Sequence, residues 1–222
     1  VEIEAAGKKL ISVKDDGEGI DPDDMEKLFN RHATSKISGA EDLDAIKSLG
    51  FRGEALYSIG AVADVVLKSK FRESGKPGKE IHVRGGKNLG IKKSSQPEGT
   101  VAEVRELFFN IPARKKFLKS DAAEMRRILN VFLPYTMAFY DKRFSLSHNG
   151  RNSLSFNPSD SCLSRFSEAV NVDGKNVMYA EKEMSPGRVS FRVLLGDINI
   201  KRPGRDTQYI FINNRPVFSQ SV

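Results

Sequence analysis

Two glycines beside a pair of acidic residues are the first feature that could do chemistry. The run Asp15-Asp16-Gly17-Glu18-Gly19 follows residues 8–15, whose alternation of apolar and polar residues predicts a strand with one buried face. A carboxylate at a strand end can accept a hydrogen bond from an exocyclic amine, such as that of adenine. Neighbouring glycines let a ligand approach the backbone closely. Taken alone, such a glycine pair is more often only a tight turn.

Two further glycine elements change the interpretation of the first. Gly50-Phe51-Arg52-Gly53 directly precedes a predicted helix, and the free N–H groups of such a turn, aided by the helix dipole, can hold phosphate oxygens. Gly99-Thr100 stands at the head of a predicted strand. Neither is a Walker A loop or a Rossmann fingerprint. The combination and order of the three elements favour a nucleotide site.

The elements that must position these residues can be predicted from hydrophobic periodicity and turn residues. A helix start is expected at residues 21–28, with Asp21 as the N-cap and Pro22 at the first helical position. Further helices are predicted at 52–62, 120–140 (kinked or ended by Pro134) and 162–171. Strands are predicted at 64–70, 79–86, 90–95, 99–107, 176–184, 188–196 and 207–213, with a hairpin over 143–157 that turns at Asn149-Gly150. This pattern indicates an α/β fold with a mainly antiparallel sheet.

Length and composition set the class of protein. The 222 residues are 39% hydrophobic, enough for one large domain or two small ones, and no apolar run is long enough to cross a bilayer. The single cysteine, Cys162, excludes an intrachain disulfide framework and fits a reducing compartment such as cytosol or nucleus.

Charge is distributed unevenly along the chain. Residues 1–50 carry 7 basic and 12 acidic side chains, whereas residues 51–222 carry 29 basic and 17 acidic ones. A body with a net charge of +12 favours polyanions such as DNA or RNA, although ordinary solvated lysines would give the same count.

Five motifs carry a resemblance to the GHKL class of ATPases and, within it, to the MutL family of mismatch-repair proteins. They occur in the family's order across nearly the whole chain. In sequence they are "DDGEGI" (15–20), "RHATSKI" (31–37), "LGFRGEALYSI" (49–59), "FFNIPARKKFL" (108–118) and "FINNRPV" (211–217). The family's versions of the first, fourth and fifth read DNGxGI, FxNxPARxKFL and VNxRxV. The resemblance implies a GHKL-type ATPase domain over residues 1–158 with a mixed, mainly antiparallel sheet, and a partial transducer domain like domain 2 of ribosomal protein S5 over 159–222.

The resemblance also implies roles for individual residues. Asp15 would bind the adenine amino group, with Gly17 and Gly19 shaping the base pocket and Thr100 supporting the contact through water. The other implied nucleotide contacts come from a lid that closes over the nucleotide, with Thr34, Ser35 and Lys36, and from main-chain groups that contact the phosphates, at Gly50, Phe51, Arg52 and Gly53.

Two departures from the family pattern matter. Asp16 stands where the family has Asn, and we interpret it as facing solvent, because alternate strand residues face opposite ways. In addition, the family's general-base Glu and its main Mg²⁺ ligand, an Asn, lie on a helix upstream of the first residue here. No catalytic residue is therefore expected within the 222 residues, and ATP and Mg²⁺ are expected as cofactors of the parent protein.

Basic residues suggest the surface that would contact DNA. Arg114, Lys115 and Lys116 flank Phe117, either as a phosphate-binding segment or as a solvated loop, and the resemblance places Arg215 in a basic groove of the second domain. No helix-turn-helix or zinc-finger spacing indicates sequence-specific reading.

The function implied is that of an ATP-gated DNA clamp that couples mismatch recognition to strand removal. Its expected partners are DNA, mismatch-containing or single-stranded, the mismatch-recognition protein MutS, downstream repair enzymes, and a second copy paired on ATP binding. The expected location is the cytoplasm, with the nucleoid, in a bacterium, or the nucleus in a eukaryote. The alternatives are a non-catalytic DNA-binding or scaffold module with a degenerate nucleotide site, and another GHKL ATPase such as a topoisomerase subunit.

The missing general base predicts that these 222 residues hydrolyse ATP little or not at all, because no positioned carboxylate activates the attacking water. A phosphate-release assay checks this against a version of the chain extended upstream. Equal turnover by the two would contradict the prediction.

Overall fold

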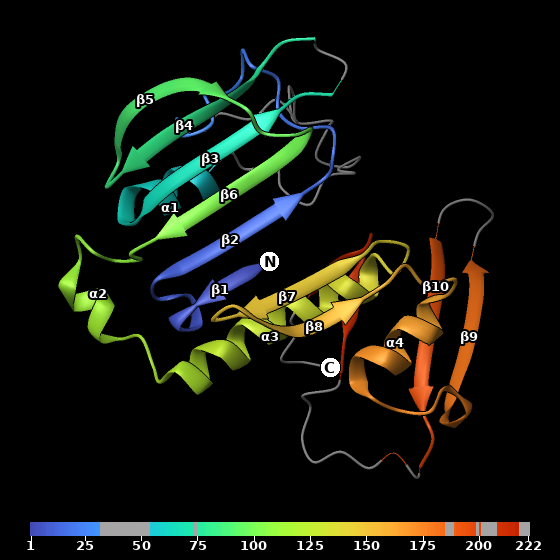
Figure 1. Ribbon diagram of the computed structural model, residues 1–222. Coiled ribbons are helices and arrows are strands. Elements are labelled where there is room, and N and C mark those ends of the chain that lie inside the picture. Colours follow the sequence, from blue (N-terminus) through green and yellow to red (C-terminus); the bar gives the residue numbers. More distant parts are fainter. Residues whose placement is uncertain (32–53, 73–74, 185–188, 199, 201–207, 218–222) are drawn as a thin grey trace. The chain divides into compact units, whose positions relative to one another are not determined.

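The computed structural model describes residues 1–31, 54–72, 75–184, 189–198, 200 and 208–217 (Figure 1). Contacts divide the chain into two compact units. The first comprises Val1–Ile128 with Ser145–Leu154, and the second Leu129–Phe144 with Ser155–Val222. Each unit is considered by itself. The predicted domain ranges, 1–158 and 159–222, stay a prediction.

An eight-stranded sheet forms the main layer, in the order β5-β4-β3-β6-β2-β1-β7-β8. β1 pairs with β7 in parallel, whereas the β1–β2, β2–β6, β3–β6, β3–β4 and β4–β5 pairs are antiparallel. The expected α/β fold with a mixed, mainly antiparallel sheet is therefore confirmed. The strands are β1 Glu2–Glu4, β2 Leu10–Asp15, β3 Asp64–Lys70, β4 Gly78–Arg84, β5 Lys87–Ser94, β6 Gly99–Arg105, β7 Phe144–His148 and β8 Arg151–Phe156.

The core lies on the face of the sheet that helix α1, Ala55–Val62, covers (Figure 1). Buried side chains alternate along β3, so that Val65, Leu67 and Ser69 all point to this face. Leu67 joins Met25, Ile81 and Val83 in one buried cluster against which Leu56 of α1 packs. Each such aliphatic side chain contributes about 1.5–3 kcal/mol on burial.

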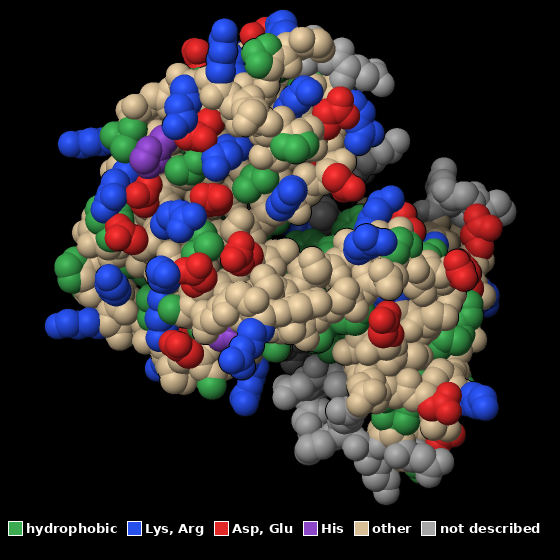
Figure 2. Space-filling model, in the orientation of Figure 1, with side chains coloured by type: hydrophobic (Ala, Val, Ile, Leu, Met, Phe, Trp, Pro, Cys, Tyr) green, Lys and Arg blue, Asp and Glu red, His purple; other side chains and the backbone are tan. Residues whose placement is uncertain are grey.

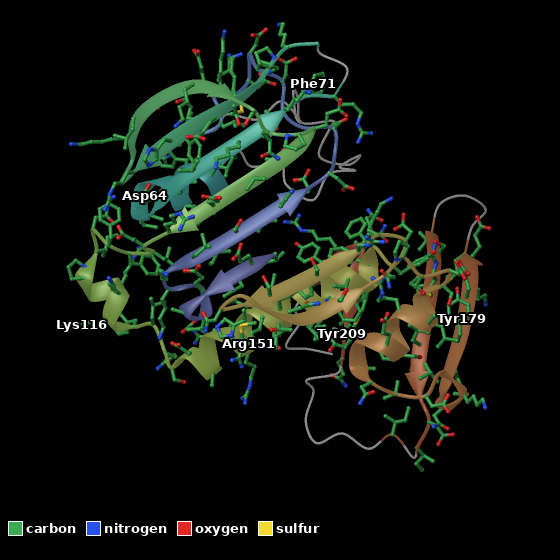
Figure 3. All side chains as sticks on the ribbon, viewed as in Figure 1. Asp64, Phe71, Lys116, Arg151, Tyr179 and Tyr209 are labelled. Atoms are coloured by element: carbon green, nitrogen blue, oxygen red, sulfur yellow. The ribbon has the colours of Figure 1, made fainter. Side chains whose placement is uncertain are left out.

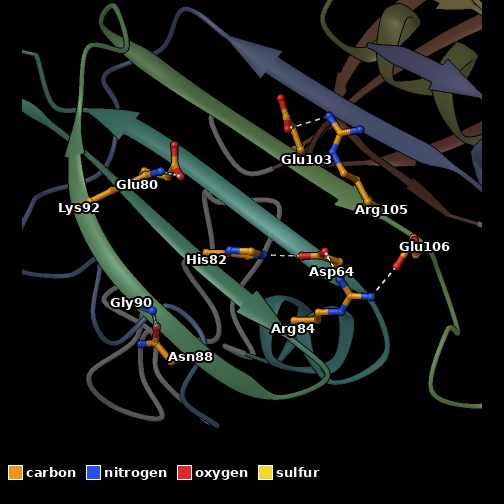
Figure 4. Close-up of polar contacts among 10 residues, drawn as sticks. All are labelled: Asp64, Glu80, His82, Arg84, Asn88, Gly90, Lys92, Glu103, Arg105 and Glu106. Atoms are coloured by element: carbon orange, nitrogen blue, oxygen red, sulfur yellow. Dashed lines mark hydrogen bonds and ion pairs between the residues drawn. The ribbon is translucent and has the colours of Figure 1, made fainter.

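The opposite face of the sheet is lined with paired charges (Figure 4). Asp64 Oδ1 lies 2.6 Å from Nε2 of His82, and Asp64 Oδ2 accepts a 3.0 Å bond from Arg84 Nη1. Arg84 Nη2 also donates a 2.8 Å hydrogen bond to Glu106 Oε2. A polar outer face and an apolar inner face are what the sequence alternation predicts for a sheet covered on one side.

The segment after the glycine pair differs from the sequence prediction. Residues 22–29 form successive turns instead of the expected helix. Each of their backbone hydrogen bonds joins an N–H to the carbonyl three residues earlier, from Asp24 to Asp21, from Lys27 to Asp24 and from Asn30 to Lys27. This spacing of three places Met25 and Leu28 on one side, against the core, so tertiary packing overrides the helix-start signal.

The helices and hairpin near the middle of the chain are mostly as predicted. The hairpin turns at Asn149 and Gly150, both with positive φ, as a two-residue turn requires. Helix α3, Asp121–Ala138, runs through Pro134, so the prediction that this proline could end the helix is wrong. A short helix not predicted from sequence, α2 Pro112–Lys116, begins at its proline, where a missing N–H costs nothing.

The second unit contains α4, Cys162–Val170, and two hairpins. Ser161 caps α4 by accepting a 3.1 Å bond from Ser164 N. Strand β9, Val177–Met184, pairs with β10, Val189–Gly196, and β11, Ile210–Ile212, pairs with β12, Arg215–Val217. Two short 3-10 turns, η1 Ala5–Gly7 and η3 Gly174–Asn176, complete the described elements. None of the described helices has the length and apolar character to span a membrane.

A buried arginine organises the second unit. Arg165 of α4 has no exposed surface, and its guanidinium donates to the carbonyl oxygens of Thr136 (2.8 Å), Tyr140 (3.1 Å), Lys142 (3.2 Å) and Asn157. The same group lies 5.3 Å from the centre of the Phe156 ring. A buried charge is tolerated only when hydrogen bonds replace its hydration, and here the two terminal nitrogens bind three carbonyls in and after the last turn of α3 and one carbonyl after β8.

Arg165→Met should lower the free energy of unfolding by about 3 kcal/mol, because the buried carbonyl of Thr136 and three part-buried carbonyls lose the donors that Arg165 supplies. Urea titration of the chain checks this. Arg151→Met is the matched control, since Arg151 is exposed on β8 (Figure 3) and its loss should change stability by no more than about 0.5 kcal/mol. Equal losses for the two variants would contradict the role assigned to Arg165.

Candidate functional site

The strand register places a carboxylate and two hydroxyls in one row across the first unit. Asp15 at the end of β2 is directly opposite Thr100 at the start of β6, and Thr100 is directly opposite Ser69 near the end of β3. Residues that face each other in antiparallel strands share one face of the sheet, with Cβ atoms about 4.5–5.5 Å apart. The three side chains therefore lie together on the face that also carries the core.

The loop after β2 is held by its own first carboxylate. Asp15 Oδ1 accepts a 3.0 Å bond from the backbone N–H of Gly17. The Asp15 side chain is exposed, and its Oδ2 makes no hydrogen bond or ion pair with any residue that the structure describes. Within the described part of the chain, this oxygen is thus an unused acceptor at the edge of the row.

Two glycines are required here because backbone packs against backbone. Gly19 has φ of +80°, and a Cβ added to it would lie 2.1 Å from the carbonyl oxygen of Lys70. Gly99 has φ of +107°, and its added Cβ would lie 2.3 Å from the carbonyl oxygen of Asp15. Any side chain at either position would push the loop away from the sheet.

Ser69 is a site residue that the sequence analysis missed. Its buried Oγ accepts a 2.9 Å bond from Ile20 N, donates to Gly99 O at 3.0 Å, and lies 3.0 Å from Thr100 Oγ1. A signal was present in the sequence, because Ser69 is polar at a position where the alternation of β3 predicts an apolar side chain.

Arg72, the second residue missed, fixes the same loop from outside the strand. Its backbone N–H donates to Glu18 O at 2.7 Å, and its Nη2 donates to Asp16 O at 3.1 Å. Glu98 lies 3.5 Å from its Nε. Together, Ser69 in β3 and Arg72 just after it hold the loop at Asp16, Glu18 and Ile20.

Asp16 is exposed, as expected, but for another reason than strand alternation. β2 ends at Asp15, so Asp16 already belongs to the loop. Its backbone is engaged by Arg72 while its carboxylate faces outward. The remaining predicted nucleotide contacts fall outside the described residues: Thr34, Ser35, Lys36, Gly50, Phe51, Arg52 and Gly53.

The predicted DNA contacts are exposed. Arg114, Lys115 and Lys116 line α2, which Figure 3 shows with Lys116 projecting from it, and Phe117 beside them is 78% exposed. On the face seen in Figure 2, acidic and basic side chains are interspersed. Arg215 is exposed on β12 in the second unit.

A shallow hollow of about 560 Å³ lies near the Asp15–Gly19 loop. The turn between β3 and β4 and the segment between β5 and β6 line it, with Lys70, Phe71, Gly78, Gln96 and Glu98. Its described lining lacks a free carboxylate beside a glycine turn, which is the arrangement suited to a base amine. Across the described residues, no group of three or more His, Cys, Asp or Glu side chains could hold a metal ion.

Comparisons with known proteins agree with this architecture. No family model matches the chain. The structure is similar to the MutL ATPase domain of Aquifex aeolicus complexed with ADP, with a TM-score of 0.74 and 33% identity, covering 99% of this chain and 75% of that one. The fold is thus that of an ATPase domain of the GHKL class.

Sequence relatives point to one member of that class. The DNA mismatch repair protein MutL of Aquifex aeolicus is 40% identical over 222 residues, which is 100% of this chain and 50% of that protein. MutL of Clostridium acetobutylicum is 42% identical over 226 residues, covering 100% of this chain and 35% of that protein. The chain belongs to the MutL family of DNA mismatch repair proteins and matches its N-terminal ATPase domain, spanning about a third to a half of these relatives.

Gly19→Ala should destabilise the chain by at least about 1 kcal/mol more than Gly150→Ala. Both glycines have similar positive φ, +80° and +76°, but a Cβ at Gly150 would meet nothing within 4 Å. The difference between the two variants in urea titration therefore isolates the contact with Lys70. Equal destabilisation would show that the loop does not depend on this close approach.

Proposed function

We propose that this chain is the nucleotide-binding and DNA-binding part of a MutL-type repair protein that uses ATP to control a DNA clamp. The observation that carries the proposal is the row of Asp15, Thr100 and Ser69 beside the glycine loop, in a family whose Aquifex aeolicus member has an ATPase domain complexed with ADP. Another GHKL ATPase, such as a topoisomerase subunit, is not favoured, because the relatives above are MutL proteins.

The adenine base would be recognised by Asp15. Its free Oδ2 can accept a hydrogen bond from the exocyclic amine, while Oδ1 is held by Gly17 N. Thr100, opposite Asp15, would support the same contact, directly or through water. Gly17 and Gly19 shape the loop that carries the carboxylate, because Gly19 allows the loop to lie against β3.

The phosphates and the lid are proposed from sequence motifs. Backbone groups of residues 50–53 would hold the phosphates, and residues 34–36 would close over the nucleotide and exclude water. Mg²⁺ would supply charge neutralisation of the phosphates in the parent protein. The described residues offer no cluster that fits it, so neither a metal ligand nor a general base is assigned among them.

DNA would be bound through its phosphates by exposed basic side chains. Arg114, Lys115 and Lys116 on α2, and Arg215 on β12, are accessible for such contacts. Nucleotide binding would shift the population toward lid closure and pairing of two copies around DNA. The proposed partners remain MutS and downstream repair enzymes, in the bacterial cytoplasm because the relatives are bacterial.

Asp15→Asn should weaken ADP binding by about 10- to 100-fold, because it removes a charged acceptor and places a donor toward the amine. Asp16→Asn is the matched control, with the same change one residue later on an exposed side chain, and should alter affinity less than about threefold. Isothermal titration calorimetry with ADP measures both. A loss of affinity confined to the Asp16 variant, or absent from both, would contradict the assignment.

Arg215→Glu should lower the affinity for single-stranded DNA at least tenfold at low salt and reduce the slope of log K against log salt. Arg151→Glu, which makes the same charge change at another exposed arginine, should have a smaller effect. Fluorescence anisotropy at several salt concentrations separates the two. Equal effects would mean that only total charge matters and that Arg215 makes no DNA contact.

A further inference from the structure

We propose that Ser69 makes the site selective for a base that carries an amino group, by fixing Thr100 as a hydrogen-bond acceptor. The proposal rests on the proposed nucleotide function and names what determines its base specificity. Ser69 does not need to touch the ligand for this role, because it acts through Thr100, its direct neighbour on β6.

The Ser69 hydroxyl makes three polar contacts. A hydroxyl has one proton to donate and two lone pairs that accept. Ile20 N is an N–H group that can only donate, so one lone pair of Ser69 Oγ accepts its 2.9 Å bond. Gly99 O is a carbonyl that can only accept, so the single proton of Ser69 goes to it at 3.0 Å.

The remaining contact then has only one possible direction. Thr100 Oγ1 lies 3.0 Å from Ser69 Oγ, which has one lone pair left and no proton. Thr100 must therefore donate its proton to Ser69. Both lone pairs of Thr100 stay available, so toward a ligand this residue can only accept.

The surroundings keep this direction fixed before any ligand binds. Ser69 is 2% exposed, so water does not compete for its hydroxyl. Its partners are the backbone N–H of Ile20 and the backbone carbonyl of Gly99. The backbone is fixed at both places, because Gly19 and Gly99 lie closer to neighbouring main chain than a Cβ would allow. Rotating the Ser69 hydroxyl away would break its hydrogen bond to the Gly99 carbonyl.

Two neighbouring acceptors then define the ligand group that fits. Asp15 as a carboxylate can only accept, and Thr100 lies opposite it on the next strand. An amine facing this pair can donate to it, whereas a carbonyl oxygen in the same place meets only lone pairs. A water molecule that bridges the two side chains would donate one proton to each and show the base only lone pairs, so the selection is the same.

The test compares two nucleotides that differ at this group. ADP carries an amine on carbon 6 of its purine and a bare N1 beside it, whereas inosine 5′-diphosphate carries a carbonyl oxygen on carbon 6 and a proton on N1. The unmodified chain should bind ADP more tightly than inosine diphosphate in calorimetric titrations. The selectivity is the dissociation constant of inosine diphosphate divided by that of ADP. Ser69→Ala frees the proton of Thr100 to turn toward the base, so this ratio should fall about tenfold.

The ratio separates selectivity from structural damage. Ser69→Ala also removes the partner of Ile20 N, and any loosening of the loop that follows weakens both nucleotides alike. Thr100→Val should lower the ratio by itself, and adding Ser69→Ala to it should produce no further change, whereas Thr100→Ser keeps the hydroxyl and should retain the ratio. Ser69→Cys, whose thiol is a weaker donor and acceptor, should lower the ratio less than Ser69→Ala does. It replaces the alanine variant in the test if that variant fails to fold.

Each result decides between the two levels of the proposal. An unchanged ratio in the Ser69 variants, with ADP still bound, overturns the selectivity role and leaves the nucleotide site standing. A further fall of the ratio on adding Ser69→Ala to Thr100→Val also overturns it, since Ser69 would then act by another route. Failure of the unmodified chain to bind either nucleotide overturns the proposed function and this inference with it.

Discussion

The candidate site depends on one constraint, the pairing register of β2, β6 and β3. This register alone brings Asp15, Thr100 and Ser69, which are far apart in sequence, onto one face and into one row. A slip of a single residue on any of these strands would turn the side chain to the opposite face. The apolar alternation of β3 protects the register, because Val65 and Leu67 would leave the core together with Ser69.

The loop that completes the site is held by backbone contacts more than by side chains. Ser69 and Arg72 bind its main chain at Ile20, Glu18 and Asp16, and Gly19 lies against the carbonyl of Lys70. Such contacts fix the position of Asp15 while leaving its outer oxygen free, which is the preorganisation that recognition of a small polar group requires. The second unit uses another device, in which buried Arg165 ties carbonyls of several segments together.

Sequence patterns predicted much of this fold, and their failures have physical causes. β3 was predicted with the bounds observed, Asp64–Lys70, because it begins with a run of β-branched and apolar residues and a segment containing glycine and proline follows it. Residues 22–29 carry a helix-start signal, yet packing of Met25 and Leu28 against the sheet selects successive turns. Pro134 predicts either a kink or an end of the helix, and α3 continues through it, with Pro134 and Thr136 buried.

The candidate site was only partly accessible from sequence. Asp15 and the glycines follow a recognisable motif, whereas Ser69 and Arg72 act through contacts that only the strand register and the loop path create. Whether Ser69 donates or accepts cannot be read from residue order, since it follows from which backbone groups surround its hydroxyl.

The position of a bound base tests the central claim most directly. A crystal structure of the chain with ADP is predicted to show the amino nitrogen of adenine within about 3.2 Å of Asp15 Oδ2. Thr100 should contact the same amine or a water that bridges it to Asp15. Adenine seated instead in the hollow lined by Phe71 and Gln96, or bound with its amine turned away from Asp15, would contradict the account.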